Sequence, residues 1–141
     1  MKRFLRLVCL FMVFATLAAV PSFAQEVAPR ASKELSSYGA YCTKTSSTTV
    51  VVSYQVFGAD FLDEIGVNTV KVQYSSDGVN WTTAKTFKKA NYTSMVNYGV
   101  SAHAGTLTAT VPSGKQYRAV VEFYGEKNGS FTERTYYTAI I

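Results

Sequence analysis

The sequence is poor in cysteine and histidine. Its 141 residues include two cysteines, Cys9 and Cys42, and a single histidine, His103. A zinc site needs several His, Cys or carboxylate ligands, and none of these stands beside His103. The Gly-x-Ser-x-Gly turn of a Ser-His-Asp hydrolase and a glycine-rich phosphate loop are both missing. We therefore expect no enzymatic activity, no metal and no cofactor.

Outside the N-terminus the chain has no long hydrophobic run. The N-terminus itself has a basic segment in residues 1–6, an apolar run from Leu7 to about Val20, and the small-x-small signal Ser22-Phe23-Ala24. This pattern is typical of a secretory signal peptide, and the run is shorter than the ~20 residues that cross a bilayer as an anchor. We expect cleavage after Ala24, secretion, and no membrane span in the mature chain.

The chain has little excess charge. It carries 14 Lys and Arg against 9 Asp and Glu, and three of the basic residues lie in residues 1–24. Cleavage therefore leaves 117 residues with a net charge of +2 and scattered charged positions, which gives no basic patch and argues against a nucleic-acid partner. That length is enough for one domain with a single core.

Cys42 is the only cysteine left after cleavage, so no disulfide can form within the mature chain. A lone cysteine in a secreted protein is either buried as a small hydrophobe or pairs with another chain. Cys42 lies in an expected strand, YGAYCTK, and burial is the favoured interpretation because cysteine is among the most buried residues. A catalytic pair with His103 is disfavoured, since burial raises the pKa of a thiol.

The pattern of the mature chain favours strands over helices. No segment has the apolar spacing of an amphipathic helix. Residues 25–37 have mixed charge and little periodicity, which indicates a flexible leader. From residue 38 onward Thr, Val, Tyr and Ser dominate between frequent turn signals, as in the short strands of a sandwich or barrel.

We expect strands at 38–44, 48–57, 69–75, 80–87, 105–111, 115–125 and 131–141, and exposed loops at 58–68, 88–98 and 125–130. This predicts one all-β domain over residues 38–141, a two-sheet antiparallel sandwich of about seven strands.

Three motifs, in this order, resemble the fibronectin type III fold. TTVVVSYQV is similar to the second strand of that family, VKVQYSSDGVNW to its third strand and hairpin, and VPSGKQYRAVVEF to its Pro-Gly turn and following strand. The resemblance covers residues 38–141 and implies that Tyr117 is a corner tyrosine, whose hydroxyl bonds to upstream backbone. The whole chain also resembles a family of small secreted bacterial proteins of unknown function, which implies a secreted bacterial protein and no particular activity.

The stretch SSDGVNW contains the only tryptophan, Trp81, shortly after Asp77-Gly78. Asp-Gly between alternating runs predicts a two-residue hairpin, in which Gly78 supplies the positive φ. Trp81 is then an apolar anchor of the next strand, the interpretation we favour because aromatic residues dominate core energetics. The alternative is a sugar-stacking platform, in which Trp81 and Tyr92 or Tyr98 lie exposed and coplanar.

Two charged clusters are further candidate sites. Asp60, Asp63 and Glu64 could bind Ca²⁺ or act as an acid–base pair, but they lack the regular Asp spacing of a calcium loop. Their apolar neighbours more simply fix the crossing between the sheets. Lys88 and Lys89 stand beside tyrosines and could attract an anionic surface, although such lysines more often keep a sheet edge soluble.

These features favour a secreted, non-catalytic, monomeric module that binds a protein or a cell surface through loops or a sheet face. The alternative is a carbohydrate-binding module that uses Trp81 and nearby tyrosines to bind a surface glycan, and a small hydrolase is least favoured. The candidate binding residues are Trp81, Tyr92, Tyr98, Lys88 and Lys89.

Overall fold

The computed structural model describes residues 32–141, so the expected signal peptide and most of the leader lie outside the described residues. The described chain is all-β, as predicted. The strands are β1 (Leu35–Ser46), β2 (Thr49–Ser75), β3 (Thr82–Lys88), β4 (Val96–Thr110), β5 (Gln116–Lys127) and β6 (Ser130–Tyr137), with one 3₁₀ turn, η1 (Thr93–Met95). Within these residues no helix has the length and apolar character needed to cross a membrane.

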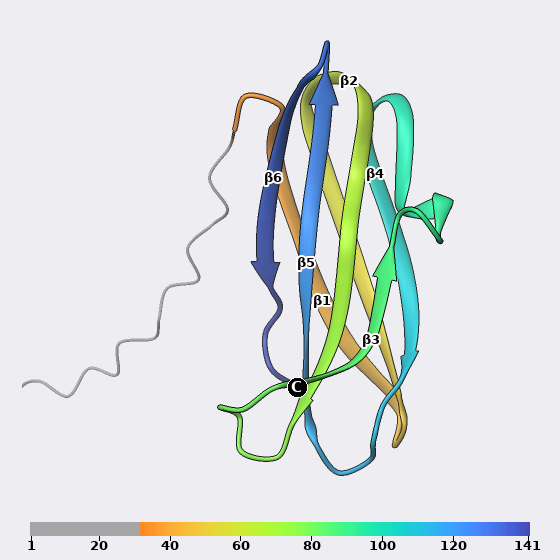
Figure 1. Cartoon of the computed structure of the whole chain (residues 1–141), viewed down its shortest axis with the longest axis vertical. Helices are drawn as coiled ribbons and strands as arrows, with labels where there is room; N and C mark the ends of the chain where they lie inside the picture. The colour runs from red at the N-terminus through yellow and green to blue at the C-terminus, as the bar shows by residue number, and fades with distance from the viewer. Residues whose placement is uncertain (1–31) are drawn as a thin grey trace, which may run out of the picture.

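The strand β2 organises the whole sheet because it changes partners along its 27 residues. Its first half, 49–57, lies between β1 and β4. Its second half pairs with β3 and β5, and β5 pairs in turn with β6. Figure 1 shows the two halves of β2 running in opposite directions, joined by a bend, so that the six strands form one curled antiparallel sheet.

The prediction of a loop at Gly58–Asn68 is wrong, because this segment is part of β2. The strand bends there through two register shifts, between Phe57 and Leu62 against β4 and between Val67 and Thr69 against β5. Three of its apolar side chains hold the bend against the core, whereas Phe61 is 66% exposed. Those buried there are Leu62, Ile65 and Val67. Two expected strands are therefore the two halves of one strand, which is why six strands replace seven.

Other strand boundaries also differ from expectation: β3 begins at Thr82 rather than residue 80, and β6 ends at Tyr137 rather than residue 141. β1 begins at Leu35, inside the expected leader, because the fully buried Leu35 side chain packs against the core. β4 begins at Val96, so residues 96–98 of the loop expected at 88–98 belong to a strand. It also includes His103, which lies outside the strands expected from the sequence. The turn between β5 and β6 is limited to Asn128 and Gly129, both with positive φ, 52° and 75°.

The core lies inside the curl and follows the alternation of the strands. Successive side chains of a strand point to opposite faces, and the inward sets of β2 and β5 are almost completely buried. These sets are Val50, Val52, Tyr54 and Val56, then Val70 and Val72, then Tyr117, Ala119, Val121 and Phe123. Burying each large apolar side chain stabilises the fold by about 1.5–3 kcal/mol, so this core decides which face of each strand is free to bind.

Tyr117 makes the hydrogen bond expected of a corner tyrosine. Its ring is fully buried, and its hydroxyl donates to the carbonyl oxygen of Pro112 at 2.5 Å. The same hydroxyl accepts a bond from the amide of Lys115 at 3.3 Å. The two bonds tie the turn before β5 to the strand that follows it.

Candidate functional site

The connection between β2 and β3 is the loop 76–81 rather than the predicted two-residue hairpin. Gly78 has the predicted positive φ, 74°. The turn is longer because one oxygen of Asp77 accepts bonds from the backbone amides of Asn80 and Val79, at 2.8 and 2.9 Å. These bonds, with those from the Asn80 and Ser75 side chains, hold the pKa of the Asp77 carboxyl well below its usual value. The loop is thus ordered by its own hydrogen bonds.

Trp81 lies at the end of this loop and is half-buried on the outside of the sheet, not in the core as we favoured. The guanidinium carbon of Arg118 lies 4.2 Å from the centre of its ring and 5.1 Å from the centre of the Tyr137 ring. The Nε of Arg118 donates to the amide oxygen of Gln73 at 2.9 Å. We refer to Trp81, Arg118 and Tyr137 as the arginine stack.

The sheet register places the arginine stack on the outer face. Arg118 is directly opposite Gln73 across β5 and β2, and Tyr137 is opposite Val120 across β6 and β5. Because both neighbours of Arg118 in β5 are fully buried, its own side chain points away from the core. A cation over an aromatic ring contributes about 0.5–2 kcal/mol, more as it is desolvated, so the stack is held in one arrangement.

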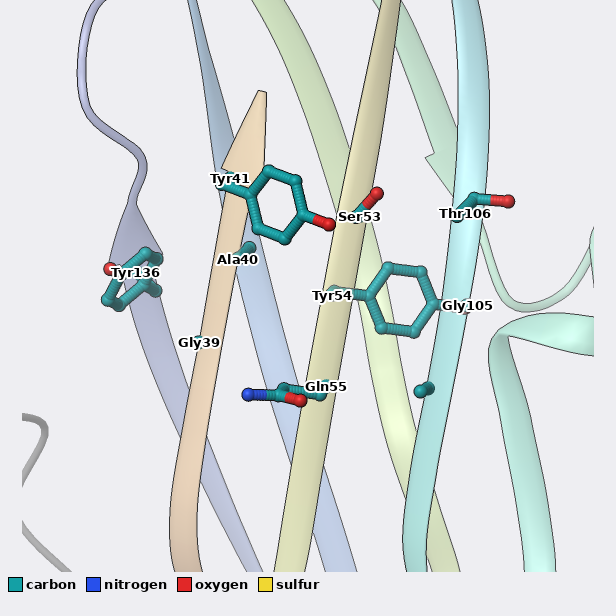
Figure 2. A pocket seen from close by; sticks show the side chains of 10 residues that line it. Gly39, Ala40, Tyr41, Ser53, Tyr54, Gln55, Gly105, Thr106 and Tyr136 are labelled. Atoms are coloured by element: carbon teal, nitrogen blue, oxygen red, sulfur yellow. The ribbon is translucent and has the colours of Figure 1, made fainter. Parts of the chain in front are cut away.

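A groove of about 630 Å³ lies over a different part of the sheet, formed by β1, the first half of β2 and β4, with Tyr136 of β6 at its side. Figure 2 shows the ring of Tyr41 extending from β1 toward Ser53 on β2, with Gln55 next to Gly39. The lining residues are small, aromatic or polar and uncharged. They are Gly39, Ala40, Tyr41, Ser53, Tyr54, Gln55, Ala104, Gly105, Thr106 and Tyr136.

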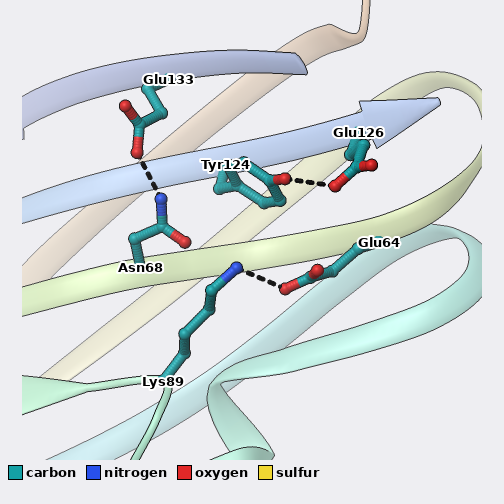
Figure 3. Close-up of polar contacts among 6 residues, drawn as sticks. All are labelled: Glu64, Asn68, Lys89, Tyr124, Glu126 and Glu133. Atoms are coloured by element: carbon teal, nitrogen blue, oxygen red, sulfur yellow. Dashed lines mark hydrogen bonds and ion pairs between the residues drawn. The ribbon is translucent and has the colours of Figure 1, made fainter. Parts of the chain in front are cut away.

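A second polar group lies on the same outer face as the arginine stack, farther along the strands, and Figure 3 shows it. The Nζ of Lys89 is 2.7 Å from Oε1 of Glu64 and 4.2 Å from the centre of the Tyr124 ring. The hydroxyl of Tyr124 donates to Glu126. Burial, that hydrogen bond and the nearby carboxylates raise the pKa of Tyr124 above its usual value, so the hydroxyl remains a donor.

The same polar group continues onto β6. The amide of Asn68 donates to a carboxylate oxygen of Glu133. The other side-chain atom of Asn68, Oδ1, is buried and has no hydrogen-bond partner within residues 32–141. Three carboxylates, of Glu64, Glu126 and Glu133, stand here beside one ammonium group, so this end of the face is net acidic.

The five residues predicted to bind do not form one surface. Trp81 precedes β3, whereas Lys88 ends that strand and Lys89 follows it. Tyr92 is half-buried edge-on against Phe87, with ring centres 5.1 Å apart. Tyr98 is 65% exposed and lies opposite Glu64 in the register of β4 and β2. Lys88 is also exposed. Lys89, Tyr98 and Lys88 therefore flank the acidic end, and Trp81 belongs to the arginine stack.

The acidic residues of the β2 bend do not converge on a common point. Asp60 pairs with Lys127 at 2.5 Å, and this bond is the main reason why the pKa of Asp60 is lowered. Asp63 accepts a bond from the Asn128 amide at 2.6 Å. Across the described part of the chain, no group of three or more His, Cys, Asp or Glu side chains could hold a metal ion.

Cys42 and His103 both face the interior. Cys42 is buried, as predicted, and its sulfur lies 3.4 Å from the Thr138 hydroxyl. Burial raises the pKa of its thiol. His103 packs its ring against Tyr54, with ring centres 5.9 Å apart, and its Nε2 lies 3.1 Å from the carbonyl oxygen of Ser94. Burial lowers the pKa of this imidazole. The two residues occupy different places in the sheet and form no pair.

Sequence reasoning missed Arg118, Tyr137 and Gln73, and it missed the groove around Tyr41. Strand alternation identifies Arg118 as outward, because it stands between inward residues of β5. Its contact with Trp81 and Tyr137 joins three segments far apart in the sequence, and only the register of the folded sheet reveals it.

No family model matches the chain, and no curated protein matches it. Among solved structures, it is similar to the crystal structure of a protein from Archaeoglobus fulgidus, with 10% sequence identity and a TM-score of 0.39. The match covers 76% of this chain and 95% of that chain.

Proposed function

We propose that the protein is a secreted, non-catalytic β-sandwich module of fibronectin type III type. In this proposal it binds a protein partner, in solution or on a cell surface, through the outer face of β2, β5 and β6. The arginine stack is the centre of the binding surface. Secretion rests on the signal-peptide pattern of residues 1–24.

The strand pairing supports the sandwich. β1, the first half of β2 and β4 make one set of neighbours, and β3, the second half of β2, β5 and β6 make another. Two such sets joined by one bent strand match the two sheets of a fibronectin type III domain, with inward side chains of both sets in a common core. The hydrogen bond of Tyr117 to Pro112 supports the same assignment.

The single observation that carries the binding proposal is the fixed position of Arg118 between two aromatic rings. Arginine, tryptophan and tyrosine are the residues most enriched at the energetic centres of protein interfaces. Here all three lie together, and Tyr137 is 56% exposed. Their positions are already fixed by the strands and by Gln73, so binding loses little side-chain entropy.

The test is recovery of partners by residues 25–141, immobilised and incubated with intact producing cells and their culture medium. Wild type, Arg118→Ala and Trp81→Ala are compared by quantitative mass spectrometry, with Thr45→Ala as the matched control because Thr45 is exposed on β1. Loss of an interface centre costs about 2 kcal/mol or more, or roughly 30-fold in affinity. We expect the same partner to be depleted in both stack variants and retained by the control. Equal recovery by all four proteins would contradict the proposal.

A further inference from the structure

The groove over β1, β2 and β4 is separate from the arginine stack and has its own chemistry. Its floor is made of small residues, among them Gly39 and Ala104. A Cβ atom added at Gly39 would meet no atom within 4 Å, so the space above this residue is open. At Gly105 a Cβ would lie 2.3 Å from the Tyr54 hydroxyl, which shows that the Tyr54 ring closes the floor from beneath.

Polar side chains from three strands line this open space. The hydroxyls of Tyr41, Ser53 and Thr106 and the amide of Gln55 make no hydrogen bond to any of residues 32–141, although all four line the groove. Each hydroxyl can both donate and accept, and the amide offers two donors and an acceptor. These groups are therefore available to a ligand that presents many hydroxyls.

The backbone amide and carbonyl groups of β2, in the middle of the groove, are already paired and cannot bind a ligand. The groove extends over three adjacent strands, and β2 in the middle is paired on both sides, with Ser53 opposite Tyr41 and Thr106. A peptide that adds a strand needs a free sheet edge, and the free edges here are the outer sides of β1 and β4, not the middle of the groove. A ligand over the middle of the groove is recognised by side chains, which favours a polyhydroxylated molecule there over an extended peptide.

The ring of Tyr41 supplies the apolar part of the site. It is 63% exposed, and Figure 2 shows it extending from β1 toward Ser53. Ligand sites combine aromatic faces with a few well-placed polar groups. A pyranose ring has this same mixture, with C–H groups on its faces and hydroxyls on its edge.

The absence of charged residues in the groove narrows the range of possible ligands further. None of the lining residues is charged. The outward positions beside them on the same strands are also uncharged, including Thr43, Val51, Phe57 and Thr108. A charged ligand would lose hydration here and find no opposite charge. The outer face around the arginine stack differs, since it carries both signs of charge.

We propose that this groove binds a neutral oligosaccharide, with the Tyr41 ring stacked on a sugar and Ser53, Gln55 and Thr106 bonded to its hydroxyls. The inference does not depend on the proposed protein-binding function, because the two sites share no residue.

The test is a titration of residues 25–141 with three neutral hexasaccharides, cellohexaose, xylohexaose and mannohexaose, and with the anionic hexagalacturonate, followed by isothermal calorimetry and amide NMR shifts. Gly39→Val fills the open space above the floor, and Tyr41→Ala removes the ring. Thr43→Val, on the same strand outside the groove, and Trp81→Ala, in the other site, are the controls. Thermal unfolding of each variant verifies its fold.

We expect at least one neutral hexasaccharide to bind, and the anionic one to bind at least ~10-fold more weakly, a difference of about 1.4 kcal/mol. Gly39→Val abolishes this binding, Tyr41→Ala weakens it ~10-fold or more, and both controls bind as wild type does. The proposal is overturned if no neutral probe binds at millimolar concentration, or if Gly39→Val and Tyr41→Ala bind unchanged. A wild-type dimer in light scattering that Gly39→Val dissociates would also overturn it, because a second copy would then occupy the groove.

Discussion

At the scale of the residue, a few side chains fix connections that the strand pattern alone leaves open. Tyr117 ties the turn before β5 to the core through its hydroxyl. Asp77 and Ser75 order the loop that delivers Trp81 to the arginine stack. The resemblance to fibronectin type III domains implied the bond of Tyr117. The environment of Trp81 could not be predicted, because its contact residue comes from β5.

Removing the Tyr117 hydroxyl tests the first of these connections. Tyr117→Phe keeps the buried ring but loses the bond to Pro112, and we expect a loss of about 1–2 kcal/mol in the free energy of unfolding. Urea denaturation measures it. Tyr98→Phe is the matched control, since Tyr98 is 65% exposed and this change should leave stability as it is. Equal midpoints for the two variants would contradict the role given to Tyr117.

Asp77 should make the fold sensitive to acid. Its pKa is lowered in the folded state, so the folded state favours the carboxylate. The resulting stabilisation is complete above the usual pKa of 3.8 and is lost as the pH falls through the lower folded value. We expect the melting temperature of wild type to fall more steeply than that of Asp77→Asn below about pH 4. If the melting temperatures of the two proteins fall in parallel with pH, the hydrogen bonds of Asp77 do not stabilise the fold in solution.

Cys42 should be unreactive while the protein is folded. The thiol is buried and its pKa is raised, and both effects suppress the thiolate that reacts with disulfide reagents. We expect slow reaction of native residues 25–141 with Ellman's reagent and fast, stoichiometric reaction in denaturant. Rapid labelling of the native protein would mean that β1 opens readily along this edge.

At the scale of the element, β2 depends on glycines where it bends. A Cβ at Gly66 would lie 2.2 Å from the carbonyl oxygen of Met95 and 2.7 Å from Cα of Val96. Both are backbone contacts that cannot move without displacing the start of β4. The sequence could not indicate this, because glycines and acidic residues in the 58–68 segment read equally well as a loop.

The substitution Gly66→Ala tests this requirement. We expect it to destabilise the fold by about 1–3 kcal/mol or more, as overpacking does. Gly39→Ala is the matched control in β1, because a Cβ there meets nothing within 4 Å. It should be neutral or slightly stabilising, since glycine weakens a strand interior. Chemical denaturation of both variants decides the point, and equal losses would remove the special role of the bend.

At the scale of the whole molecule, the curled sheet separates two surfaces of different character. The all-β class and the inward faces of β2 and β5 could be predicted, because alternation of Val and Tyr has only one physical interpretation. The functional surfaces could not. Trp81, Arg118 and Tyr137 come from a loop and two strands, and their meeting depends on the register of β2, β5 and β6.

The measurement that tests the central claim most directly is site-specific photo-crosslinking on intact producing cells. A benzophenone side chain replaces Lys71, opposite Val120 on the face of the arginine stack, or Thr45 on β1 as the control. The account predicts a discrete crosslinked protein from position 71, none from position 45, and loss of the product when Arg118→Ala is added. The same products from both positions, or a product from position 71 that persists without the Arg118 side chain, would contradict it.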